Sequence, residues 1–114
     1  MFDRSSSPDL RAFVIWVPKS FGSESAVAEA AATVKDPRAR HYWDEGGHLM
    51  SRYSRLLALP EDAWDIFFIY ERTARWDGPE PPKPDFLMHQ LGPDVPGPPL
   101  DGARFASEAL SRLR

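Results

Sequence analysis

Few side chains in this sequence could do chemistry. Asp44 and Asp65 are candidates for a general acid and a general base, because two neighbouring carboxyl groups can divide the roles of proton donor and proton acceptor. Neither lies in a recognisable nucleophile or metal motif. The pair supports the hypothesis of a non-thiol enzyme that acts on a small polar substrate. The alternative is that both carboxylates cap or brace turns.

Serine and histidine add little to this hypothesis. Ser20 or Ser23 would need a histidine base to act as a nucleophile, and no Gly-x-Ser-x-Gly elbow is present. His41, His48 and His89 are the only histidines, and none lies three or four residues from another. We therefore predict no metal site and no cofactor.

The composition excludes several function classes. The chain has no cysteine, which rules out disulfides, thiolate zinc sites, iron–sulfur clusters and thiol nucleophiles. Lys and Arg number 14 against 17 Asp and Glu, a net charge of -3, so no positive field attracts nucleic acid or anionic lipid.

The beginning of the chain indicates a cytoplasmic protein. Met1 to Leu10 lack the apolar run of a signal peptide, and no apolar stretch of the sequence is long enough to cross a bilayer. Residues 1–10 are expected to be a flexible segment, and 11–114 a single domain.

Two fully apolar runs predict inner strands. Ala12 to Val17 and Ile66 to Tyr70 are rich in β-branched and aromatic residues, which is typical of strands covered on both faces. In the segments Ala39 to Asp44 and Asp85 to Leu91, apolar and polar residues are mixed, which suits strands at the edges of a sheet.

Three segments with helical spacing separate or follow these strands. One runs from Ser23 to Val34, a second carries Leu49, Tyr53, Leu56 and Leu57, and a third follows a cap at Asp101. The proline-rich segments 77–84 and 92–100 predict stiff surface loops.

The resulting order is strand, helix, strand, helix, strand, strand, helix. It resembles the thioredoxin fold, which implies an α/β domain with a four-stranded mixed sheet in the order 2-1-3-4 and helices on both faces. The chain is also similar to uncharacterised bacterial thioredoxin-like proteins in three segments, namely Val14-Ile15-Trp16, His41-Tyr42-Trp43-Asp44 and Ala63-Trp64-Asp65.

The redox signatures of that family are missing. Ser20-Phe21-Gly22-Ser23 stands where redox members carry Cys-x-x-Cys, and serine cannot cycle between dithiol and disulfide. Trp64-Asp65 precede the third strand, where those members carry a cis-proline. The sequence therefore predicts a protein that is not a thiol-disulfide oxidoreductase.

The resemblance implies a site at one edge of the sheet, where ligands bind in α/β folds. A polar or anionic group could be held there by stacking, hydrogen bonds and a helix N-terminus. Alternatively, the tryptophans cover the core and the polar groups only cap helices or turns. The ligand-binding candidates are Lys19, Ser20, Ser23, Trp43, Asp44, Trp64, Asp65 and Gly92.

We expect a non-redox binding or accessory domain for an unknown protein or small-molecule ligand, with the non-thiol enzyme as the alternative. Aromatic residues make up 12% of the chain, so some of them, such as Trp76 or Phe86, should be exposed as a contact surface. Strand 85–91 exposes an apolar edge with Phe86 and Met88 and predicts a symmetric homodimer that covers this strand or the aromatic surface near it.

Overall fold

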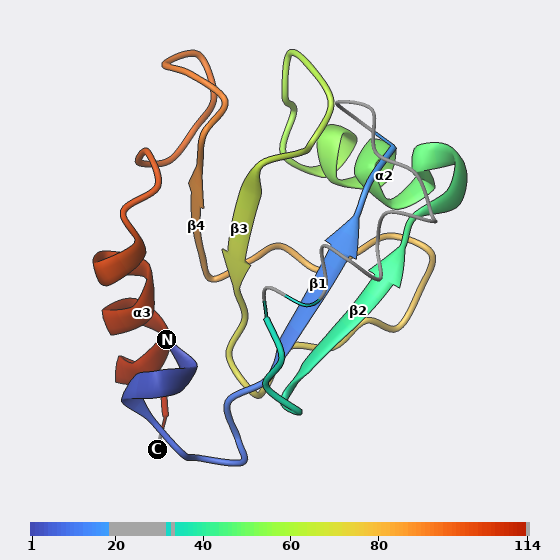
Figure 1. Cartoon of the computed structure of the whole chain (residues 1–114). Coiled ribbons are helices and arrows are strands. Elements are labelled where there is room, and N and C mark those ends of the chain that lie inside the picture. The colour runs from blue at the N-terminus through green and yellow to red at the C-terminus, as the bar shows by residue number, and fades with distance from the viewer. Residues whose placement is uncertain (19–31, 33, 114) are drawn as a thin grey trace.

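The computed structural model describes residues 1–18, 32 and 34–113 (Figure 1). The helix expected from Ser23 to Val34 lies, apart from residues 32 and 34, outside them. The remaining expected strands and helices are confirmed, with ends that differ by a few residues. The described elements are η1 (Phe2–Arg4), β1 (Ala12–Trp16), β2 (Ala39–Trp43), η2 (Glu45–Gly47), α2 (His48–Leu56), β3 (Ile66–Ile69), β4 (Phe86–His89) and α3 (Gly102–Ser111).

The strands form two separate sheets. β1 and β2 pair in parallel, from Ala12 opposite Ala39 to Trp16 opposite Trp43. β3 and β4 pair antiparallel, with Ile66 opposite His89. The expectation of a thioredoxin-like α/β domain, with one four-stranded mixed sheet in the order 2-1-3-4 and helices on both faces of it, is therefore wrong. Within the described residues no ladder joins β1 to β3.

The two apolar runs, β1 and β3, differ in how far their side chains are buried. β3 meets the interpretation of a strand covered on both faces, because Ile66 and Phe68 pack toward α2 while Ile69 packs toward α3. β1 does not, because the side chain of Phe13 is 65% exposed. The sequence patterns are alike, so the expectation of a shared sheet with both strands inside was too strong.

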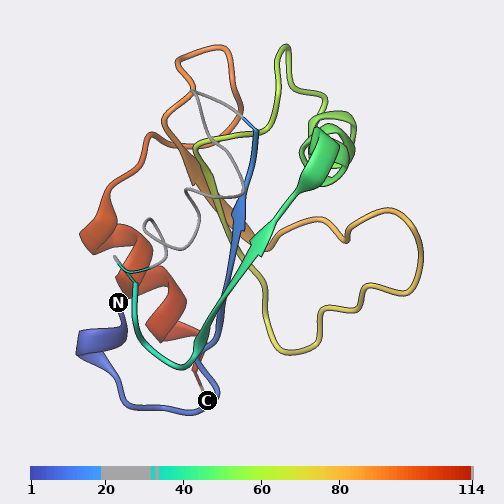
Figure 2. The same cartoon turned by 45° about the vertical axis from the view of Figure 1, so that its right-hand side comes forward.

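Two hydrophobic cores lie on opposite faces of β3. Figures 1 and 2 show α2 and α3 on opposite sides of the molecule with the strands between them. The core on the α3 side is built on Leu10, Ile69 and Ala109, with Phe86 and Phe105 packed against it. The core on the α2 side is built on Met50, Tyr53 and Ala63.

Asp101 begins α3 as predicted. Its carboxylate oxygen Oδ1 accepts a hydrogen bond from the backbone N–H of Arg104 at 3.1 Å. This contact satisfies one of the helix donors that have no partner within the helix itself. The helix buries Ala106 and Ala109, and Ala109 packs in one core with Ile69 of β3.

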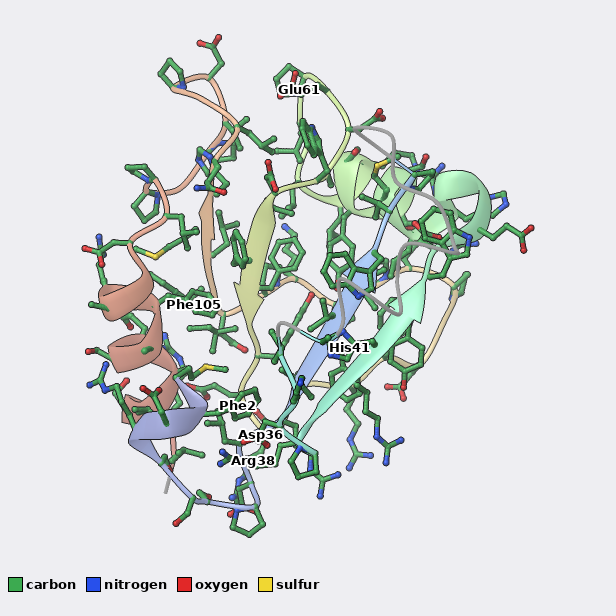
Figure 3. All side chains as sticks on the ribbon, in the orientation of Figure 1. Phe2, Asp36, Arg38, His41, Glu61 and Phe105 are labelled. Carbon is green, nitrogen blue, oxygen red and sulfur yellow. The ribbon has the colours of Figure 1, made fainter. Side chains whose placement is uncertain are left out.

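The guanidinium of Arg38 fastens the N-terminal segment to the turn before β2. It bonds both carboxylate oxygens of Asp36, at 2.9 and 2.8 Å. It also donates to the carbonyls of Phe2, Ser5 and Ser7 at 2.7 to 3.1 Å. All five guanidinium N–H groups are thereby used. Figure 3 shows Phe2, Asp36 and Arg38 gathered at one end of the molecule.

Asp36 should consequently titrate at unusually low pH. The hydrogen bonds from Arg38 lower its pKa from 3.8 to about 2. Since the folded-state pKa is depressed, this carboxylate stabilises the fold fully above the unfolded-state pKa, and the contribution disappears as pH falls toward 2. Carboxyl NMR titration should report the low pKa, and Arg38→Gln should return it toward 3.8.

Arg75→Gln, which changes an exposed arginine in the 71–80 loop, is the control and should leave the titration of Asp36 unchanged. A midpoint near 3.8 for Asp36 in the unmodified protein would contradict its hydrogen bonding to the guanidinium of Arg38.

Candidate functional site

Of the described candidate residues, only Gly92 lies in the wall of the hollow that follows the end of β4. Lys19, Ser20 and Ser23 lie outside the described residues. The other five candidates are distributed over the end of β2, the loop before β3 and the loop after β4, and each has a different environment.

Asp44 is engaged at the start of α2. Its Oδ1 accepts from the backbone N–H of Leu49 at 3.1 Å and its Oδ2 from that of Met50 at 2.9 Å. These two N–H groups belong to the first turn of the helix, where no intrahelical acceptor exists. Each oxygen of this carboxylate thus already accepts one helix donor. The capping alternative describes its geometry.

The two tryptophans are half-buried, one at the end of β2 and the other before β3. Trp64 packs against the core on the α2 side, together with Ile66 and Phe68. Trp43 is the last residue of β2. Neither of them lines the hollow that follows the end of β4, which is described below.

Asp65 and Gly92 lie beside that hollow. Asp65 is exposed and has a φ of 51°, in the left-handed region that few side chains other than Asn and Asp adopt. Its carbonyl accepts from the N–H of Gln90 at 2.9 Å. Gly92 has a φ of 107° and contributes to the wall of the hollow.

The hollow has a volume of about 370 Å³ and follows the end of β4 into the loop 92–100. Its wall consists mainly of proline, glycine and valine with one amide side chain. The lining residues are His89, Gln90, Gly92, Pro93, Val95, Gly97 and Pro99.

His89 holds the loop that forms the hollow. It is 3% exposed, and its Nδ1 accepts from the N–H of Leu91 at 3.1 Å. The proton must therefore be on Nε2, which faces the carbonyls of Val95 at 3.1 Å and Gly97 at 3.0 Å. Both ring nitrogens therefore bond backbone groups of the loop after β4, and we call these three hydrogen bonds the His89 latch.

The same loop covers the edge of β4 that was expected to form a homodimer. The N–H of His89 donates to the carbonyl of Pro98 at 3.3 Å, and its carbonyl accepts from Leu100 at 2.8 Å. Met88 is fully buried, and Phe86 packs against the core under α3. The expectation that Phe86 is exposed was wrong, because α3 lies over it, whereas Trp76 is exposed at 49% as expected.

Exposed aromatic rings gather instead on one face of the β1–β2 sheet. Phe13 is 65% and Tyr42 45% exposed, and their ring centroids lie 6.4 Å apart at an interplanar angle of 27°. Strand alternation places Arg40 on the same face, because Phe13 lies opposite it in the parallel register. We call Phe13, Arg40 and Tyr42 the aromatic face.

Two buried hydroxyl groups anchor the proline-rich loop 77–84. Tyr70 donates to the carbonyl of Pro82 at 2.7 Å, so the 2.8 Å contact between hydroxyls has Tyr53 as the donor to Tyr70. Burial raises the pKa of both tyrosines. Trp76 meets Tyr53 edge to face with centroids 6.4 Å apart. These phenols serve as hydrogen-bond donors within the fold.

In the part of the chain that the structure describes, metal-binding clusters and membrane-spanning helices are both absent. No group of three or more His, Asp or Glu side chains there is placed to hold a metal ion. No helix there has the length and apolar character needed to cross a bilayer.

No protein-family model matches the sequence, and no match is found among curated proteins or among solved structures. The site must therefore be judged from its own geometry.

Removal of the Asp44 carboxylate should lower the stability of the ligand-free protein, because the carboxylate caps α2. Asp44→Ala leaves two helix N–H groups without acceptors and should lower the free energy of unfolding by about 1 kcal/mol. Asp65→Gly is the matched control, since glycine adopts a positive φ freely and the change should be neutral or slightly stabilising. Urea unfolding measures both. Equal losses in the two variants would contradict the capping role.

Loss of the His89 latch should loosen the loop 92–100. His89→Ala leaves two carbonyls and one N–H unpaired, so we expect a loss of about 2 to 3 kcal/mol in the free energy of unfolding. The Leu91 amide should also exchange faster with solvent. His48→Ala, at an exposed position, should stay within about 0.5 kcal/mol of the parent. An unchanged Leu91 amide in His89→Ala would refute the latch.

Proposed function

We propose that this chain is a non-catalytic binding domain and that the aromatic face binds an acidic, partly apolar segment of a partner protein. The observation that carries this proposal is the stacked pair of exposed rings, Phe13 and Tyr42, on neighbouring strands. Rigid aromatic side chains give a large contact area at a small loss of conformational entropy. Exposed aromatic clusters of this kind are typical of protein-binding surfaces.

Charge supports an acidic partner. Arg40 is exposed, and Arg11, also exposed, precedes β1 at the position that alternation places on the same face. Among the described residues neither guanidinium has an ion-pair partner, while the chain as a whole carries a charge of -3. Two such faces would repel one another in a homodimer. A segment rich in Asp and Glu would be attracted.

The chemistry of the remaining candidates favours binding over catalysis. Asp44 is committed to two helix donors and His89 to three backbone groups. Tyr53 and Tyr70 are committed to one another and to Pro82. The polar groups of the aromatic face are the guanidinium of Arg40 and the phenol of Tyr42, which suit recognition of carboxylates more than bond breaking.

The proposal can be tested with a synthetic peptide in which Glu alternates with Leu and Phe. NMR titration should give saturable binding with shifts centred on Phe13 and Tyr42. Phe13→Ser and Arg40→Glu should each weaken binding by about tenfold, a loss of about 1.4 kcal/mol. Both positions are exposed, so the variants should keep the parent circular dichroism spectrum.

Two matched variants serve as controls. Trp76→Ser removes another exposed aromatic ring, and Arg75→Glu reverses another exposed arginine, both outside the aromatic face. Neither should weaken binding by more than about twofold. Equal losses in these controls, or no saturable binding of the acidic peptide, would overturn the proposal.

A further inference from the structure

We infer that the partner segment binds as an added β-strand along the outer edge of β2. This inference rests on the proposed function and specifies its geometry: main-chain hydrogen bonds to β2 would hold an extended acidic segment beside the aromatic face. Strand addition to an exposed sheet edge is an established way of binding peptides.

The hydrogen-bond pattern of β2 identifies the groups that would take part. The carbonyl of Arg38 accepts from Ala12, and the N–H of Asp44 donates to Trp16, so the even-numbered residues of β2 face β1. In a parallel ladder, alternate residues direct both backbone groups to the same neighbour. The N–H and C=O groups of His41 and Trp43 therefore point away from β1.

These groups are unpaired in the part of the chain that the structure describes. No backbone hydrogen bond there involves His41 or Trp43 on the outer side, whereas the N–H of Ala39 is already taken by the carbonyl of Asp36. Unpaired backbone groups along a strand form a template for another strand. A two-stranded sheet also gains stability when a third strand joins it.

The outer edge of β4 is less suited to this role. At β4 the outward groups of His89 already bond Pro98 and Leu100 of the same chain. Leu87 on that edge is also approached closely by Gly97. β2 carries no such cover within the described residues, and in Figure 1 it is drawn at the opposite end of the row of strands from β4.

The edge and the aromatic face would act together. Side chains of an added strand alternate between its two faces, so every second one would lie beside Arg40 and Tyr42. Acidic residues in those positions would pair with Arg40, and apolar ones would contact the exposed ring of Tyr42. This arrangement predicts a partner segment that alternates in polarity with a period of two.

Peptide N-methylation provides the test. We would prepare the acidic peptide methylated on the backbone nitrogen of every second residue, in each of the two possible frames. An added strand uses N–H groups of alternate residues only, so one frame should weaken binding by at least about tenfold and the other by less than about threefold.

Amide exchange gives an independent readout on the protein itself. The N–H groups of His41 and Trp43 should exchange rapidly in the free protein and become at least about tenfold slower when the unmethylated peptide is bound. The N–H of Tyr42 faces β1 and should be protected in both states, which makes it an internal control.

The outcomes separate this inference from the proposed function. Saturable binding that depends on Phe13 and Arg40, without frame dependence or new protection at His41 and Trp43, would overturn strand addition and leave the binding function intact. Absence of saturable binding would overturn both. Frame dependence together with slowed exchange at His41 and Trp43 would support strand addition.

Discussion

The fold depends on the packing of β3 against two helices at once. Ile69 reaches the core beneath α3, while Ile66 and Phe68 reach the core beneath α2. A four-residue strand thus joins two clusters that would otherwise be small and separate. Burial of large side chains on both faces provides the main stabilisation of such a strand. β4 completes this central pair with the fully buried Met88.

Polar contacts then fasten the loops to this centre. Two consecutive hydrogen bonds, from the Tyr53 hydroxyl to that of Tyr70 and from Tyr70 to the carbonyl of Pro82, connect the proline-rich loop to α2 and β3. His89 ties the loop after β4, and Arg38 ties the N-terminal segment. In each case a side chain binds backbone carbonyls that have no partner in a helix or sheet. Buried backbone groups require such partners, so these few side chains determine the paths of long irregular segments.

The sequence predicted elements well and their assembly poorly. Asp101 could be recognised because a helix cap is a local signal, read from the residues that follow it. The role of Arg38 could not, because three of its acceptors are carbonyls of Phe2, Ser5 and Ser7, which every residue type carries. Strand pairing is non-local in the same way. β1 and β3 have equally apolar sequences, and only the tertiary structure decides that β3 is covered on both faces while Phe13 is exposed. The candidate site was inferred from the expected sheet, and its described residues lie at the end of β2, before β3 and after β4.

The β1–β2 pair has a different balance of interactions from the centre of the molecule. Its exposed face keeps two aromatic rings in water, which gives up hydrophobic stabilisation that β3 gains by burial. On the opposite face the sheet is held by specific polar contacts: Trp16 donates to Nδ1 of His41 at 3.1 Å, and Nε2 of His41 therefore carries the proton it shares with the carbonyl of Val34 at 3.0 Å. Such contacts fix the relative position of the two strands without covering the rings. A sheet held in register from one face, with aromatic and cationic side chains on the other, is already organised before any partner arrives. Binding to it would lose little additional conformational entropy, and for this reason a small two-stranded surface can be sufficient for recognition.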